Sequence, residues 1–126
     1  MKNPILIVVE GNFYLADQTL RLVQAQGLLV RLTVELREAC DLLQQRLDIV
    51  LLAAPLAVAA VRATLFNRNR SLHPRQQILV VAKAGDSKEG ILELMEAGAF
   101  SCMRGPAPAK AVVKEVHRIR RLPRAA

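Results

Sequence analysis

The sequence predicts an α/β domain in which a five-stranded parallel sheet carries helices on both faces. Strand-like and helix-like segments alternate five times along the 126 residues. Three of the strand-like segments are continuous apolar runs after their first residue, as expected of strands buried on both faces. Alternation of this kind is typical of parallel sheets with helical crossovers. A chain of this length forms one domain and buries roughly two-thirds of its unfolded surface, so it needs no metal or disulfide to fold.

The strand-like segments are rich in β-branched and other apolar residues. Three of them, PILIVV, DIVLLA and QILVVA, carry no charge after the first residue. The segment LLVRLTV includes an arginine, and the last, FSCMR, is short. We therefore expect strands at residues 4–9, 28–34, 48–53, 77–82 and 100–104.

Apolar residues recur with helical spacing between these strands. Asn12 and Asp17 are alternative N-caps for the first helix, and Gly27 and Gly98 are expected to end the first and fourth helices. The expected helices run from residue 12 or 17 to 26 and over 35–45, 57–66, 87–97 and 107–121. The clearest apolar stripe is in the last helix, formed by Ala109, Val112, Val113, Val116 and Ile119.

Four segments, residues 5–10, 48–55, 78–82 and 97–106, resemble the receiver domain of two-component response regulators in content and spacing. The resemblance implies a flavodoxin-like (βα)5 fold with strand order 2-1-3-4-5. It indicates one receiver-like domain over residues 3–121, followed by a tail or the start of a linker at 122–126.

In that family, an Asp after the third strand accepts a phosphoryl group beside Mg²⁺, which an acidic pair after the first strand helps to hold. A hydroxyl after the fourth strand and a Lys after the fifth stabilise the phosphoryl oxygens. This sequence departs from the pattern nearly throughout. The matching positions hold Val9 and Glu10 (acidic pair), Ala53 (acceptor), Ala82 (hydroxyl), Cys102 (aromatic switch), Gly105 (Lys) and Pro106 (the retained proline). Because the methyl group of Ala53 cannot accept phosphate, the resemblance implies a pseudo-receiver that is not an enzyme.

Other chemistries lack their motifs. Neither a GxGxxG nor a GxxxxGK[ST] loop is present, and His73 and His117 have no ligand at metal-binding spacing. We expect no cofactor and no metal. Cys40 and Cys102 are far apart, which favours reduced thiols in a cytoplasmic protein. The longest uncharged segment, residues 49–61, is shorter than the roughly 20 residues of a membrane span, so we expect no membrane partner.

The net charge of +7 is concentrated in two basic stretches. In the predicted fold, the third and last helices end at the same edge of the sheet. Cations there are also favoured by the helix dipole, so an ordinary solvated surface is an alternative to a binding surface. The arginines expected at this edge are Arg68, Arg70, Arg75, Arg118, Arg120, Arg121 and Arg124.

An acidic fourth helix and a basic fifth helix suggest a second surface. In receivers, these helices and the fifth strand commonly form dimers, and charge complementarity fits either a two-fold contact or pairing within one chain. The hypothesis is a phosphorylation-independent module of signal transduction or transcription regulation that acts through a protein partner or a homodimer. The alternative is a nucleic-acid-binding module that uses the arginine edge. The charged residues of the helical surface include Glu89, Glu93, Glu96, Lys110 and Lys114.

Overall fold

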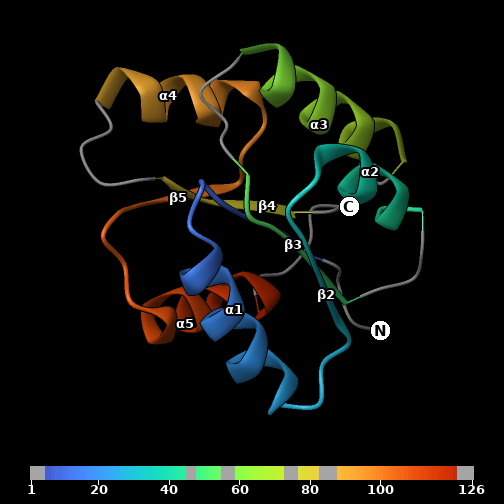
Figure 1. Ribbon diagram of the computed structural model, residues 1–126. Helices are drawn as coiled ribbons and strands as arrows, with labels where there is room; N and C mark the ends of the chain where they lie inside the picture. The colour runs from blue at the N-terminus through green and yellow to red at the C-terminus, as the bar shows by residue number, and fades with distance from the viewer. Residues whose placement is uncertain (1–4, 45–47, 55–58, 73–76, 83–87, 122–126) are drawn as a thin grey trace.

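The computed structural model describes residues 5–44, 48–54, 59–72, 77–82 and 88–121. Within these ranges, strands and helices alternate along the chain (Figure 1). The strands are β1 (Ile5–Val9), β2 (Val30–Thr33), β3 (Ile49–Leu52), β4 (Gln77–Ala82) and β5 (Ser101–Arg104). The helices are α1 (Phe13–Gln24), α2 (Leu36–Leu42), α3 (Ala59–Leu72), α4 (Lys88–Ala97) and α5 (Ala109–Arg121).

The five strands form one parallel sheet in the order β2-β3-β1-β4-β5. The predicted fold class, a doubly wound α/β sandwich of five strands, is confirmed. The central strand is β1, in which Ile7 pairs with Leu51 on one side and with Leu79 on the other. The observed order therefore differs from the expected 2-1-3-4-5 by the exchange of β1 and β3.

The apolar pattern of the sequence could not predict this exchange of β1 and β3. Both β1 and β3 are buried along their whole length, so their apolar patterns do not indicate which of them is central. Right-handed crossovers determine which face each helix covers, and either order satisfies that rule. The choice between the two orders lies in side-chain packing, which the periodicity of the sequence does not report.

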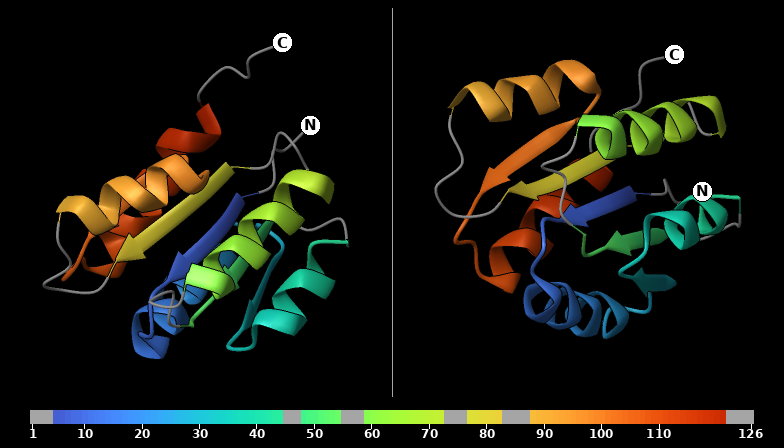
Figure 2. Two further views of the ribbon diagram at one scale, coloured as in Figure 1. Left: turned by 90° about the horizontal axis from the view of Figure 1, so that it is seen from above. Right: turned by 45° about the horizontal axis from the view of Figure 1, so that its top comes forward.

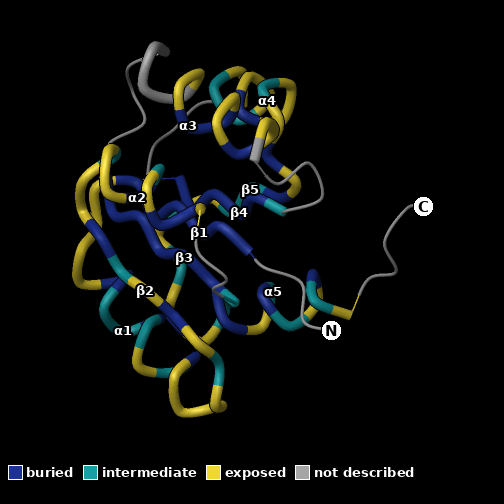
Figure 3. Tube along the Cα trace, turned by 90° about the vertical axis from the view of Figure 1, so that its right-hand side faces the viewer, coloured by how far each residue is buried: buried dark blue, intermediate teal, exposed yellow. Residues whose placement is uncertain are grey.

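The helices form two layers, with α1 and α5 on one face of the sheet and α2, α3 and α4 on the other (Figures 1 and 2). The side chains of β1 point alternately toward the two helical layers. Ile5, Ile7 and Val9 belong to the apolar cluster that includes α1 and α5, whereas Leu6 and Val8 belong to the cluster beneath α2, α3 and α4. The strands are accordingly buried, and the outer sides of the helices are exposed (Figure 3).

Local signals place most helix ends. The Asn12 side chain accepts a hydrogen bond from Leu15 N at 2.9 Å and caps α1, which settles the choice between the two expected caps. One helix differs: α3 was expected to end at Phe66 but continues to Leu72. Its added turn keeps Asn69 buried while Arg68 and Arg70 are exposed, so the polar residues extend the solvent side of the helix rather than ending it.

No helix within the described parts of the chain is long and apolar enough to span a membrane. The expected tail, residues 122–126, lies outside the described residues, as do Arg75 and His73.

Candidate functional site

A cavity of about 160 Å³ lies where β1, β4 and β5 end, at the carboxyl edge of the sheet. Two backbone hydrogen bonds hold its rim together: Glu10 N donates to Val81 O at 3.0 Å, and Gly105 N donates to Ala82 O at 2.8 Å. The cavity is lined by Val9, Glu10, Asn12, Leu15, Val81, Ala82, Gly105, Pro106 and Ala107. The fold thus brings five of the seven expected pocket residues together.

The lining of this cavity is mostly alkyl and backbone. Among the described residues around it, Glu10 supplies the one charged side chain; it is buried and engaged with another group of the protein. No cluster of three or more His, Cys, Asp or Glu side chains suited to a metal ion occurs among the described residues. The bond between Gly105 and Pro106 is cis. A single carboxylate without a hydroxyl or amine opposite it is a poor site for Mg²⁺ and phosphate.

The other two expected pocket residues lie elsewhere. Ala53 follows β3, and its amide donates to Thr33 O of β2 at 3.0 Å. Because β1 is central, Ala53 is separated from the cavity by β1 itself. Cys102 is half-buried and packs against the apolar cluster under α2, α3 and α4. The expected order 2-1-3-4-5 makes the third strand, which Ala53 follows, the central one; in the structure β1 is central, so the central position at this edge belongs to Glu10.

A second candidate site is a groove of about 490 Å³ along β5 and α5. Its apolar part comes from Met103 and Ala111, and three cations line it together with one carboxylate. The charged lining residues are Lys114, Glu115, Arg118 and Arg121.

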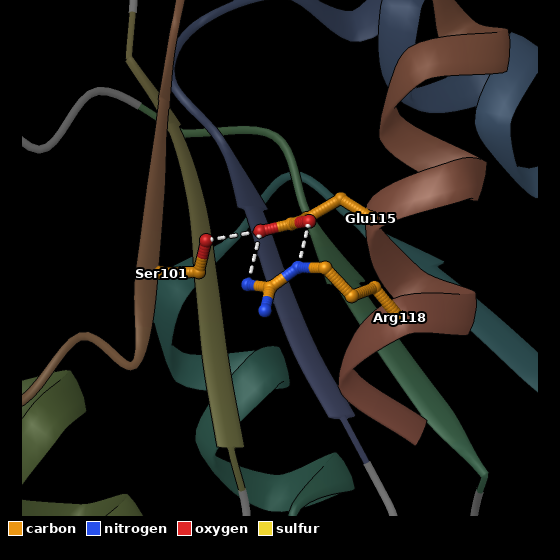
Figure 4. Close-up of polar contacts among 3 residues, drawn as sticks. All are labelled: Ser101, Glu115 and Arg118. Carbon is orange, nitrogen blue, oxygen red and sulfur yellow. Dashed lines mark hydrogen bonds and ion pairs between the residues drawn. The ribbon is translucent and has the colours of Figure 1, made fainter. Parts of the chain in front are cut away.

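Glu115 organises this groove (Figure 4). It accepts a hydrogen bond from the Ser101 hydroxyl at 2.5 Å, which ties α5 to β5. The Arg118 guanidinium donates to both of its oxygens, at 2.6 and 2.8 Å. The hydrogen bonds from Arg118 are the main cause of a lowered Glu115 pKa, and Ser101 contributes in the same direction against partial burial. Glu115 in turn raises the pKa of Arg118. The sequence analysis did not single out Ser101 or Glu115, although their residue types are compatible with such a link.

The basic residues do not form one open surface. The carboxyl ends of α3 and α5 do reach the same end of the sheet, from opposite faces, as expected (Figure 2). However, Arg70 Nη2 donates to Ala97 O at the end of α4 at 3.2 Å, and one guanidinium nitrogen of Arg120 is buried without a hydrogen-bond partner among the described residues. Arg68, Arg70, Arg118 and Arg121 are exposed, and Arg120 is half-buried.

The acidic and basic helices are well separated. Glu93 is exposed on α4, whereas Lys110 and Lys114 are exposed on α5, which covers the opposite face of the sheet (Figure 1). Arg118 pairs within its own helix. This arrangement does not favour pairing between α4 and α5 inside one chain, which was one of the two alternatives left open by the sequence.

The environment of the Cys40 thiol does not activate it. Cys40 is half-buried, and burial raises its pKa more than the nearby Arg68 lowers it. A raised pKa keeps the thiol protonated at neutral pH and therefore a poor nucleophile.

The fold is shared with solved receiver domains. No protein family model matches the chain, and no curated protein sequence matches it. A CheY-like receiver domain protein from Methanospirillum hungatei JF-1 superposes with a TM-score of 0.70 at 15% identity, over 93% of each chain. The beryllofluoride-activated NtrC4 receiver domain dimer gives 0.70 at 13% identity, over 91% of this chain and 94% of that one. A pilus assembly protein, CpaE, from Burkholderia thailandensis E264 gives 0.60 at 23% identity, over 91% and 96%. At these identities the likeness establishes the fold, which is that of a receiver domain.

Proposed function

We propose that this chain is a phosphorylation-independent receiver-like module of signal transduction or transcription regulation that acts by binding a protein partner. It is not an enzyme and uses no cofactor in this role. The observation that carries the proposal is the chemistry of the carboxyl-edge cavity. Phosphoryl transfer to a receiver needs an acceptor carboxylate, a metal and donors for the phosphoryl oxygens.

The cavity supports a structural role for this edge. Its alkyl walls include the side chains of Val9 and Ala82, and Gly105 offers no amine. Ala53, at the acceptor position of the resemblance, has a methyl group and lies across β1. A cavity of about 160 Å³ with one engaged carboxylate leaves little room for a phosphoryl group with a hydrated metal.

The β5–α5 groove supports binding of a protein segment. An apolar floor at Met103 and Ala111 would bury apolar side chains, and the Lys114 and Arg121 cations would face acidic ones. Glu115 holds Arg118 in place, so part of this surface is ordered before a partner arrives. The partner expected here is a segment that carries both apolar and acidic residues.

Nucleic acid remains the second candidate partner, and the structure favours it less. Arg70 and Arg118 are exposed but hydrogen-bonded to Ala97 O and to Glu115, and one guanidinium nitrogen of Arg120 is buried, so these arginines are only partly available to phosphates. Nucleic-acid surfaces usually present a continuous row of cations.

The test follows backbone amide signals by NMR while Mg²⁺ and beryllofluoride are added. Beryllofluoride is a fitting probe because a receiver domain of the same fold forms a beryllofluoride-activated dimer. We expect no saturable shift at Glu10, Ala53 or Ala82. A receiver domain that retains its acceptor Asp is the positive control, and saturable shifts at those three residues of this chain would overturn the proposal.

A further inference from the structure

The β2 edge of the sheet is open and offers unused backbone groups. β2 pairs with β3 alone, and it is the last strand on its side (Figures 1 and 3). Leu29 O and Thr33 O accept hydrogen bonds from Ile49 N and Ala53 N of the β3 segment. Because backbone groups alternate in direction along a strand, the N–H and C=O groups of Val30 and Leu32 point away from the sheet.

An apolar groove runs beside this edge. Its volume is about 440 Å³, and it lies between β2 and α1. Val34 and Phe13 both line it, and they are 51% and 54% exposed, which is high for large apolar side chains. Val30 and Leu32 line the same groove. Exposed apolar surface next to an unpaired strand is a typical setting for the addition of another strand.

Charged residues of both signs border the groove. Arg31 lies on β2, while Glu35 and Glu38 lie at the start of α2, and all three are exposed. The Glu35 side chain makes no capping hydrogen bond to α2, so its carboxylate does not serve the helix end. An edge that carries both signs is suited to a partner with the same two signs in reverse order.

We propose that this edge binds a second copy of the chain, with the two β2 strands antiparallel across a two-fold axis at Leu32. The segment Val30–Val34 alternates apolar and polar residues symmetrically about Leu32. In this register, Leu32 faces Leu32 of the second copy, and Val30 faces its Val34. The outward backbone groups of Leu32 then pair with their counterparts, and the two sheets become one.

The same register brings opposite charges together. Arg31 lies opposite Thr33 of the second copy, with Glu35 of that copy two residues further on. A diagonal neighbour at this spacing is within reach of a long side chain. The contact is isologous, so the dimer contains two Arg31–Glu35 pairs, against one diagonal Arg31–Arg31 contact across the axis. This inference is independent of the proposed function, because the β5–α5 groove lies at the opposite edge of the sheet.

The first test measures molecular mass by sedimentation over a concentration series. We expect a dimer with a dissociation constant on the order of micromolar or weaker, since the paired strands are short. Val34→Lys should abolish it, because a cation at the edge cannot be buried against Val30. Leu92→Lys is the matched control: Leu92 is 59% exposed on α4, remote from β2, and the variant should dimerise like the wild type.

The second test uses exchanged charges. Arg31→Glu alone and Glu35→Arg alone should each weaken self-association at least tenfold, because each homodimer then places like charges together. An equimolar mixture of the two variants should restore a dimer, since both contacts of the mixed pair join opposite charges. A role of either residue in folding alone would not produce rescue by mixing. A monomer at every concentration, or a dimer that Leu92→Lys disrupts and Val34→Lys does not, would overturn the inference. Neither result would affect the proposed function, which beryllofluoride titration tests.

Discussion

At the scale of single residues, Glu115 makes the most consequential polar contact of α5. Its lowered pKa means that the ionised carboxylate is favoured more strongly in the folded state than in the unfolded chain. This contribution to stability is present above the ordinary Glu pKa of 4.5 and is lost as the pH falls through the lower folded value. Glu115→Gln should therefore lower the free energy of unfolding by about 1 kcal/mol near pH 7, and the deficit should shrink below pH 4.5.

Urea unfolding at a series of pH values checks this expectation, with Glu96→Gln on the exposed side of α4 as the control. An equal deficit at every pH would show that Glu115 acts through packing rather than charge.

The hydrogen bond between Ser101 and Glu115 is a contact that the sequence alone does not predict. Ser101 and Glu115 are 14 positions apart, and their contact depends on how α5 lies along β5. In contrast, the resemblance to receiver domains was enough to place positions 9, 10, 82, 105 and 106 together at the carboxyl edge.

At the scale of elements, the end of α4 depends on one glycine. Gly98 N donates to Met95 O at 3.2 Å and Ala99 N donates to Leu94 O at 3.0 Å, the pattern of a Schellman motif. Gly98 has φ of 131°, which other residues rarely adopt, and a Cβ there would lie 3.3 Å from Arg70 Nη2.

Gly98→Ala should lower the free energy of unfolding by about 2 kcal/mol, mostly through backbone strain. Thermal or urea unfolding measures it, and Glu96→Ala, two residues earlier, should change stability little. Equal stability of Gly98→Ala and the wild type would contradict the strain argument.

Elements were predictable where a local signal marks them. The apolar runs located all five strands, and Asn12 and Gly98 lie at helix ends because capping depends on neighbouring residues alone. The end of α3 was misplaced because the polar residues after Phe66 were taken as a stop signal, whereas Arg favours helices and Asn disfavours them only mildly. The β2 groove was overlooked because Val34 was taken simply as part of the second strand, although an edge strand leaves one side open.

At the scale of the whole molecule, the position of β1 governs the carboxyl edge. With β1 between β3 and β4, Glu10 faces the cavity and Ala53 does not. Apolar periodicity predicts that both strands are buried but carries no information on their order, so this part of the site needed the packed structure. Among the side chains at this edge, Glu10 carries a carboxylate, whereas Val9, Ala53 and Ala82 carry no oxygen, so the lack of an acceptor at position 53 does not depend on the strand order.

The distribution of charge over the whole molecule leads to a prediction about nucleic acid. The net charge of +7 suggests attraction to DNA, but affinity depends on how many cations meet phosphates at once. Arg68, Arg70, Arg118 and Arg121 are all exposed at this end of the sheet, but Arg70 is hydrogen-bonded to the end of α4 and Arg118 to Glu115, which limits the contact of these two with phosphates. Since each phosphate contact contributes about −0.9 to the slope of log K against log salt, we expect a slope no steeper than about −3 for a DNA duplex.

Fluorescence anisotropy between low and physiological salt measures that slope, with Arg37→Ala on α2 as a control for general charge loss. A slope of about −5 or steeper that Arg68→Ala and Arg121→Ala reduce, and Arg37→Ala does not, would favour the nucleic-acid function over a protein partner.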